Sequence, residues 1–335
     1  MTEIATGEAL FLALGGLILG IIMLVKGGDW AVDAAVFLAE RIGMSHLVIG
    51  FTIIAFGTSL PELIVGVNAN LDGSPGIAIG NVLGSHIANI LMVGGMAALV
   101  APIVCSSKEL PRQVYFMLGA TVLLAGLIVF GEINRIAGLV MVLLLLGYVY
   151  YEYQLAKSGA LEVEEIEEPS YSSTWSAVGF LLVGFFIVTL GAEFMVGSAQ
   201  LAASIIGIPE AVIALTIIAF GTSLPELSTC MVAMAKKHGD IVLGNLIGSN
   251  VFNILMIMGV TALAKPIVQG DFSEQIVTID IWITLGVTIL FSIGILFFNR
   301  ISKPIGIIFV AGYVVYIVTL YALYLPEIMS KTGVS

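Results

Sequence analysis

A short polar sequence, GTSLPE, occurs twice in this chain, at residues 57–62 and again at residues 221–226. It lies near the start of a longer repeat: residues 52–91 and 216–255 align without a gap at an offset of 164 positions, and their first twelve residues are identical. Each copy places a glutamate, two hydroxyls and a proline within highly apolar sequence. A repeat that served packing alone would need only apolar residues, so this repeat indicates a site.

Each proline should alter the helix that contains it, because proline has no N–H and its ring clashes with the carbonyl four residues earlier. Pro61 is expected to free the carbonyl of Gly57 and to disturb that of Thr58, and Pro225 should act in the same way in the second copy. Thr58 and Glu62 are four positions apart and therefore share a helical face. Freed carbonyls within a membrane must line a cavity or meet a partner. Each copy thus offers hard oxygen ligands on one face.

Glu62 and Glu226 are costly side chains in such surroundings. An ionisable residue at the centre of a membrane span costs at least ~2.5–3.5 kcal/mol and is a functional candidate by default. The apolar helices of the two repeats contain no Lys or Arg that could neutralise the carboxylates. A cation from solution is the natural partner. Two close carboxylates also repel each other, so protons should compete with metal cations for the site.

A second polar stripe follows each glutamate at a spacing of four residues. Its members are Asn81, Ser85 and Asn89 in the first copy and Asn245, Ser249 and Asn253 in the second. Glycines at the same spacing should let helices pack closely, and Asn81 and Asn245 fit equally well as packing amides or as ligands. The serines and the last asparagine of each stripe recur beside the glutamates. This favours a role as cation ligands or as residues that hydrogen-bond to the ligands.

Calcium suits this set of oxygens. It takes six to eight oxygen ligands at about 2.3–2.6 Å in flexible geometry, and two carboxylates would balance its charge. Sodium accepts fewer and weaker oxygens, which hydroxyls, amides and carbonyls supply, whereas magnesium retains its water and prefers octahedral geometry. The copy of His86 is Asn250, so this lone imidazole is interpreted as a packing residue rather than a ligand.

The elements that must position these groups are membrane-spanning helices. With 59% hydrophobic and 10% charged residues among 335, the chain is not a soluble globular domain. A spanning helix needs ~20 mainly apolar residues. Ten stretches qualify: 8–40, 45–71, 76–101, 113–130, 133–156, 175–205, 210–235, 241–264, 276–297 and 303–325. The predicted fold is an all-α polytopic membrane protein.

The repeat divides these ten helices into two groups of five, over residues 1–156 and 174–335. An odd number of spans gives the second five-helix repeat inverted topology, which is typical of secondary transporters with a midplane substrate site. Residues 157–173 contain five glutamates and read as a solvated acidic linker rather than a cation sensor. Four charged residues are expected near the ends or bends of the long first and sixth helices, as interface anchors or a structural pair rather than transport ligands: Lys26, Asp29, Asp33 and Glu193.

The basic residues of the connections predict the orientation of the chain in a cell membrane, since Lys and Arg favour cytoplasmic loops. With both termini outside, eight basic residues fall inside: Arg41, Lys108, Arg112, Lys157, Lys236, Lys237, Arg300 and Lys303. Three fall outside: Arg135, Lys265 and Lys331. This assignment makes the linker at 157–173 cytoplasmic.

At these motifs the chain resembles the calcium/cation antiporter superfamily, and most of all the prokaryotic sodium/calcium exchangers. GTSLPE occurs twice, each time followed by GN-x-x-GS, and the likeness covers essentially the whole chain. The resemblance implies a secondary active transporter that exchanges Ca2+ for Na+ by alternating access. It also implies that the first and sixth helices slide past a core of eight.

The resemblance further implies roles for individual residues. Calcium would be bound by Glu62 and Glu226 and by backbone oxygens at Thr58 and Thr222. Sodium would be bound by the same glutamates and by neighbouring polar residues: Ser59, Ser223, Ser85, Ser249, Asn89 and Asn253. Some family members carry aspartate where this chain has Asn253, and its absence argues against dependence on potassium.

Other functions remain to be weighed against sodium/calcium exchange. A proton/calcium antiporter could use the same glutamates, and dependence on sodium distinguishes the two. An intramembrane protease could use paired acids, but it needs no repeated hydroxyls or amides, so an enzyme is not expected. A passive cation channel fits the inverted halves less well. The expected partners are the lipid bilayer and the transported ions Ca2+ and Na+, or H+, with no cofactor, nucleic acid or required protein partner.

Overall fold

The fold is a bundle of long helices. The computed structural model describes residues 2–104, 107–157, 171–205 and 221–332. The first part of the chain forms α1 (Thr2–Ile42), α2 (His46–Ile49), η1 (Gly50–Ile54), α3 (Ala55–Thr58), α4 (Leu60–Leu71), α5 (Pro75–Ala88), η2 (Asn89–Val93), α6 (Gly94–Val100), α7 (Leu110–Phe130) and α8 (Arg135–Lys157). The rest forms α9 (Thr174–Ile205), α12 (Leu224–Ala235), α13 (Gly239–Phe252), η4 (Asn253–Met258), α14 (Gly259–Ala264), η5 (Ile276–Asp280), α15 (Ile281–Phe298) and α16 (Lys303–Thr332).

Eight helices of the described residues are long and apolar enough to cross a membrane, and a ninth span is the pair His46–Thr58 and Leu60–Leu71, bent by 46°. These nine correspond to nine of the ten expected spans. The tenth, expected over 210–235, is described only from residue 221, where it contains the shorter apolar helix Leu224–Ala235. The acidic linker expected at 157–173 lies, apart from its ends, outside the described residues.

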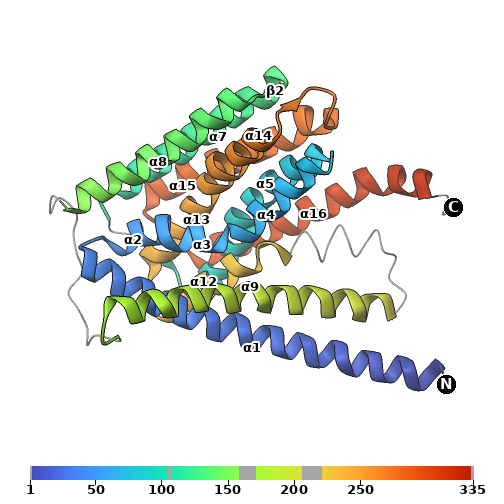
Figure 1. The fold of residues 1–335 in the computed structure, drawn as a ribbon, viewed down its shortest axis with the longest axis horizontal. Helices are drawn as coiled ribbons and strands as arrows, with labels where there is room; N and C mark the ends of the chain where they lie inside the picture. Colours follow the sequence, from blue (N-terminus) through green and yellow to red (C-terminus); the bar gives the residue numbers. More distant parts are fainter. Residues whose placement is uncertain (1, 105–106, 158–170, 206–220, 333–335) are drawn as a thin grey trace.

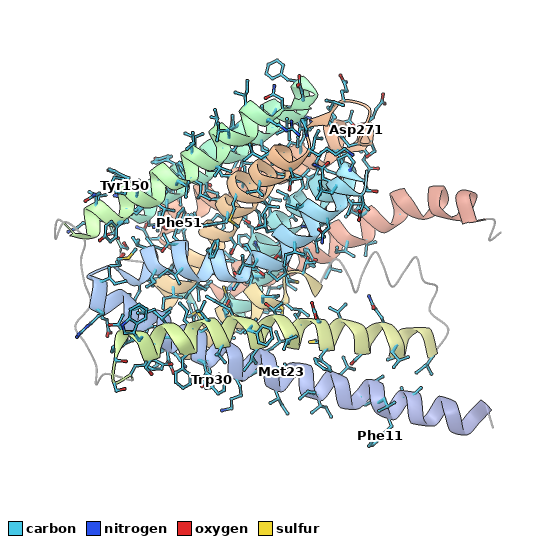
Figure 2. The ribbon with its side chains drawn as sticks, viewed as in Figure 1. Phe11, Met23, Trp30, Phe51, Tyr150 and Asp271 are labelled. Atoms are coloured by element: carbon cyan, nitrogen blue, oxygen red, sulfur yellow. The ribbon has the colours of Figure 1, made fainter. Side chains whose placement is uncertain are left out.

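The helices that carry the second polar stripe of each repeat lie at the centre of the bundle. Of the 18 most apolar consecutive residues in the spans Pro75–Val100 and Gly239–Ala264, 78% and 89% are buried, against 17% for α1 and 11% for α16. Phe51 is fully buried in the middle of the bundle, while Phe11 of α1 is 76% exposed and points away from it (Figure 2). The exposed apolar side chains of the outer helices suit contact with lipid.

Helices α1 and α9 lie side by side along one edge of the molecule and run in opposite directions (Figure 1). Glycines bring their backbones together. A Cβ added to Gly20 would lie 2.8 Å from the carbonyl oxygen of Gly191, and one added to Gly27 would lie 2.8 Å from that of Gly184. Because Gly184 and Gly191 are the repeat counterparts of Gly20 and Gly27, the two contacts mirror each other.

Short strands, which the all-α expectation omitted, join the connections between helices. β1 (Ile103–Val104) pairs with β4 (Arg300–Ile301), and β2 (Glu132–Ile133) pairs with β3 (Ile267–Val268), all antiparallel. Each pair joins one half of the chain to the other. The strands are two residues long, so the sequence carries no alternating pattern that would predict them.

Candidate functional site

The serine of each GTSLPE copy has the same backbone geometry and stands directly before the helix that carries the glutamate. Ser59 separates α3 from α4 with φ −87° and ψ 5°, and Ser223 precedes α12 with φ −91° and ψ 7°. The proline is the second residue of the new helix in each case, where its missing N–H costs no helical hydrogen bond. The expected disturbance is present, and it separates Thr58 from the helix that carries Glu62.

The break places each glutamate in the first turn of a new helix. The N-terminus of a helix carries partial positive charge, which favours a carboxylate there. Glu62 is fully buried, and Glu226 is 1% exposed. Both carboxylate oxygens of Glu62 and the Oε2 of Glu226 have no hydrogen-bond partner among the described residues. Buried polar atoms are normally paired. The unpaired carboxylate oxygens are therefore available to bind a cation.

Side chains of the first repeat meet those of the second. Ser59 Oγ donates to Glu226 Oε1 at 3.4 Å, and Thr58 Oγ1 lies 3.5 Å from Asn245 Oδ1. Ser249 Oγ donates to the same Asn245 oxygen at 3.2 Å. The Glu62 and Glu226 carboxylates are close enough to interact electrostatically. Residues 187 positions apart in sequence therefore form one polar cluster.

The two central asparagines occupy equivalent backbone positions. Asn89 and Asn253 each begin a π-helical segment, η2 and η4. π-helical turns frequently occur at functional sites. Asn89 Nδ2 donates to Asn250 Oδ1 at 3.2 Å, whereas neither polar atom of Asn253 has a partner among the described residues. Ser85 Oγ is likewise buried and without a partner in the described part of the chain.

Thr222 stands apart from the buried cluster. It is half-buried and lines a cavity of about 170 Å3 together with Pro61, Pro225 and Glu193. The expectation that Glu193 lies near an end or bend of its helix is wrong, because α9 continues for twelve residues beyond it. Glu193 instead faces the turn that begins each glutamate-bearing helix.

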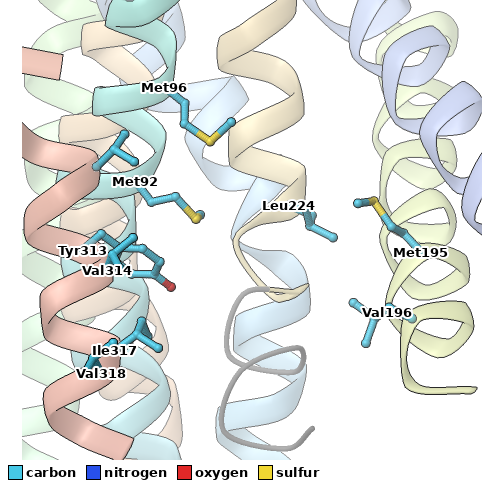
Figure 3. A pocket seen from close by; sticks show the side chains of 11 residues that line it. Met92, Met96, Met195, Val196, Leu224, Tyr313, Val314, Ile317 and Val318 are labelled. Atoms are coloured by element: carbon cyan, nitrogen blue, oxygen red, sulfur yellow. The ribbon is translucent and has the colours of Figure 1, made fainter. Parts of the chain in front are cut away.

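A larger cavity, of about 520 Å3, does not coincide with the glutamates. It lies between η2, α6 and α16 on one side and α9 and α12 on the other (Figure 3). Methionine and aliphatic side chains line it, among them Met92, Met195 and Leu224, and Tyr313 contributes the one polar side chain of its described lining. An apolar wall of this kind offers no set of cation ligands.

Sequence reasoning left the part played by Asn245 open, and the structure places it at the centre of the polar cluster. Besides accepting from Ser249, its Nδ2 lies 3.4 Å from Thr229 Oγ1 and 3.2 Å from Cys230 Sγ. Its counterpart Asn81 donates instead to the backbone carbonyl of Glu62 at 3.3 Å. The two amides thus have different partners although their sequence contexts match.

An ion-pair cluster lies at the other end of α12. Lys236 Nζ lies 2.5 Å from Asp29 Oδ1 and 2.6 Å from Asp33 Oδ1, which joins α12 to α1. The expectation of a structural pair is confirmed for these two aspartates. Their partner was assigned to a loop, and no sequence pattern indicates that the end of α12 packs against α1.

A multi-pass helical bundle with buried carboxylates and clustered hydroxyls at its centre defines a membrane protein with a polar cluster inside its spans. The family described as sodium/calcium exchanger protein matches residues 12–154 and 176–322, and this chain belongs to that family. The family is one of transporters, so the chain is a transporter and not an enzyme. The two matched segments fall in the two halves of the chain.

Known relatives agree along nearly the whole length. The inner membrane protein YrbG of Escherichia coli is 33% identical over 93% of this chain and 98% of its own. The sodium/calcium exchanger MaX1 of Methanosarcina acetivorans is 31% identical over 91% of this chain and 97% of its own. A structure of the sodium-calcium exchanger NCX_Mj superposes with a TM-score of 0.79 at 32% identity and covers 93% of this chain and 99% of its own.

Cation binding is recorded within this group. NCX_Mj has been studied in crystals soaked with sodium together with calcium or with strontium. The chain therefore belongs to a family of multi-pass membrane proteins that bind the cations they transport.

Proposed function

We propose that this protein is an antiporter that exchanges Ca2+ for Na+ by alternating access. The observation that carries the proposal is the pair Glu62 and Glu226, whose buried carboxylates interact with each other and keep three oxygens without partners among the described residues. A divalent cation would neutralise both charges at once. Among the described residues, no group of three or more His, Cys, Asp or Glu side chains competes as a metal site.

The proposed calcium ligands are the two carboxylates with backbone oxygens at Thr58 and Thr222. The helix break at the following serine supports this, because carbonyls beside a break are not all used within the helix. The proposed sodium ligands are the same glutamates with the polar side chains packed beside them: Ser59, Ser85, Ser223, Ser249, Asn89 and Asn253. Sodium and calcium would then compete for shared oxygens, which couples their movements.

The proposed architecture is ten spans in two inverted five-helix repeats, 1–156 and 174–335, joined by a cytoplasmic linker at 157–173. The antiparallel pairing of α1 with α9 through mirrored glycine contacts supports inversion. Both termini would lie outside the cell membrane, with Lys236 and Lys237 on the cytoplasmic side. If more than two sodium ions exchange for each calcium, net charge crosses the membrane, and the potential contributes about 2.3 kcal/mol per charge per 100 mV.

The test is uptake of radioactive calcium into proteoliposomes loaded with sodium and diluted into sodium-free buffer. Uptake should require internal sodium and disappear in Glu62→Gln. Glu132→Gln, which removes an exposed carboxylate in β2, is the matched control and should transport normally. Uptake that ignores sodium but follows an imposed pH gradient would reassign the protein as a proton/calcium antiporter. No uptake under either gradient by folded protein would exclude calcium as the substrate.

A further inference from the structure

Glu193 is a carboxylate in an unusual place. It lies well inside the membrane span Thr174–Ala202, and its side chain is exposed. A charged side chain at such depth is costly in lipid and is normally paired or turned toward water. No basic side chain of the described residues forms an ion pair with it. The exposed face of Glu193 is therefore best explained by a water-filled entrance.

The cavity beside Glu193 borders the two turns that precede the buried glutamates. Its wall includes Pro61 and Pro225, and each of these prolines directly precedes one of the two buried glutamates. The volume of about 170 Å3 has room for several water molecules at about 30 Å3 each. Thr189 and Thr222 also line it and present hydroxyl groups. A partly hydrated cation would fit between Glu193 and the start of α4 and α12.

The repeat provides an internal comparison for Glu193. Its counterpart 164 positions earlier is Asp29, which is paired with Lys236. The counterpart of Lys236 is Asp72, and that of Asp33 is Gly197. On the α1 side the acid is thus paired with a lysine of the protein, whereas on the α9 side the equivalent acid has no basic partner among the described residues. The two acids therefore differ in the cation available to them: Asp29 has a lysine of the protein, and Glu193 has a cation from solution.

We propose that Glu193, together with the hydroxyls of Thr189 and Thr222, forms an entry site that binds the transported cation before it reaches Glu62 and Glu226. The inference rests on the proposed cation exchange and adds a residue outside the repeated motifs. A carboxylate in a low-dielectric cleft raises the local concentration of cations. On the opposite face Asp29 would take the same part once Lys236 leaves it.

The test is calcium transport measured as a function of calcium concentration on each face. Right-side-out cells present the face that the orientation assigns to Glu193, and inverted vesicles present the other. Glu193→Gln should raise the half-saturating external calcium about three- to tenfold and leave the rate at saturating calcium close to that of the wild type. It should also weaken the dependence of transport on ionic strength, because an attractive charge has been removed. Half-saturation from the opposite face should not change.

Three further variants separate an entry site from a structural role. Glu193→Asp keeps the charge and should restore most of the affinity. Glu132→Gln removes another exposed acid and should leave half-saturation unchanged. Glu193→Lys reverses the charge and should raise half-saturation more than Glu193→Gln does, which provides a second reading if the Gln variant folds poorly.

The entry site would be overturned if the wild type transports calcium and neither Glu193→Gln nor Glu193→Lys changes the half-saturating external calcium concentration. An equal change on both faces would also overturn it, because it would indicate a general structural effect. Failure of the wild type to transport calcium would instead refute the proposed function, and the same variants would then be compared by sodium flux.

Discussion

The two copies of GTSLPE have the same sequence and the same backbone break, yet their hydroxyls have different partners. In the first copy Ser59 donates to Glu226, and Thr58 approaches Asn245 of the second repeat. The reciprocal contacts are missing from the described residues: Ser223 Oγ has no partner, and Thr222 lines the cavity beside Glu193. The hydroxyls of the first copy thus reach across to the second repeat, whereas Ser223 is buried without a partner and Thr222 faces the cavity.

Because the two motifs are identical, the asymmetry between their contacts comes from conformation. In the proposed antiporter, two inverted repeats would give two access states, each arising when the halves exchange conformations. A single state must therefore be asymmetric even where the sequences match. The ion pairs of Lys236 with Asp29 and Asp33 lie on the α1 side, and the cavity lies on the α9 side. Both observations fit closure on one face only.

The largest expected effect concerns the feature that the halves share. Glu62→Gln and Glu226→Gln should each weaken calcium binding by roughly 100-fold or more, since a unit charge pair at 4 Å is worth about 4 kcal/mol at an effective dielectric constant of 20. Calcium titration of the purified protein measures this. If calcium binding were unchanged after replacement of one of the two glutamates, the two halves would not share this role.

A smaller effect should separate the two motif serines. In protein free of sodium and calcium, Ser59→Ala should lower stability by about 1 kcal/mol because it loses the hydrogen bond to Glu226, whereas Ser223→Ala should cost almost nothing. Thermal unfolding in detergent provides the measurement. Added calcium should stabilise both variants less than the wild type if both hydroxyls support the ion site. Equal losses in the ion-free protein would contradict the contact pattern.

The ion pairs on the α1 side should bias the access equilibrium modestly. Partly exposed pairs are worth about 0.2–1 kcal/mol each, so loss of both pairs in Lys236→Gln should shift the population about two- to thirtyfold toward the state open on that face. The buried thiol of Cys230 is a native probe. In a Cys105→Ser background it should react faster with an impermeant maleimide added to inverted vesicles. Lys237→Gln is the neighbouring control, and an equal acceleration there would refute the bias.

The smallest expected effect is that of pH on the same ion pairs. Burial lowers the pKa of Lys236, but hydrogen bonds and charge interactions with Asp29 and Asp33 raise it by more, so that it lies above the ordinary value. A raised lysine pKa adds stability below the ordinary pKa, ~10.4, and the stability is lost as pH rises through the higher value. The maleimide labelling rate of Cys230 in Lys236→Gln, divided by that in the wild type, should therefore stay constant between about pH 6 and 9. A ratio that changes across this range would show that another group controls the contact.

Much of the site could be predicted from the sequence because its ligands are local. Pro61 and Glu62 are adjacent, so any helix formed there carries a break and a carboxylate together. The spacing of Ser85 and Asn89 by four similarly puts them on one helical face. The repeated polar residues in apolar sequence were sufficient to select the glutamates, since buried charge is costly unless it has a use.

Contacts between distant segments could not be predicted in this way. Nothing in the sequence indicates that Thr58 meets Asn245 rather than Asn81, because both asparagines occupy the same position of the repeat. The pairing of Lys236 with Asp29 depends on the packing of α12 against α1, which brings the end of α12 to the aspartates. Glu193 looked like a residue near a helix end because the sequence does not show how far its helix continues.

The sequence alone therefore determined that this is a helical membrane protein with two equivalent glutamate sites, since periodicity, hydropathy and proline chemistry act over a few residues. The three-dimensional packing is needed to show that Ser59 donates to Glu226 while Ser223 has no partner among the described residues. Those choices depend on how α1 and α9 pack against the remaining helices. Two conformations of the same repeated sequence can satisfy the same local rules, and packing selects between them.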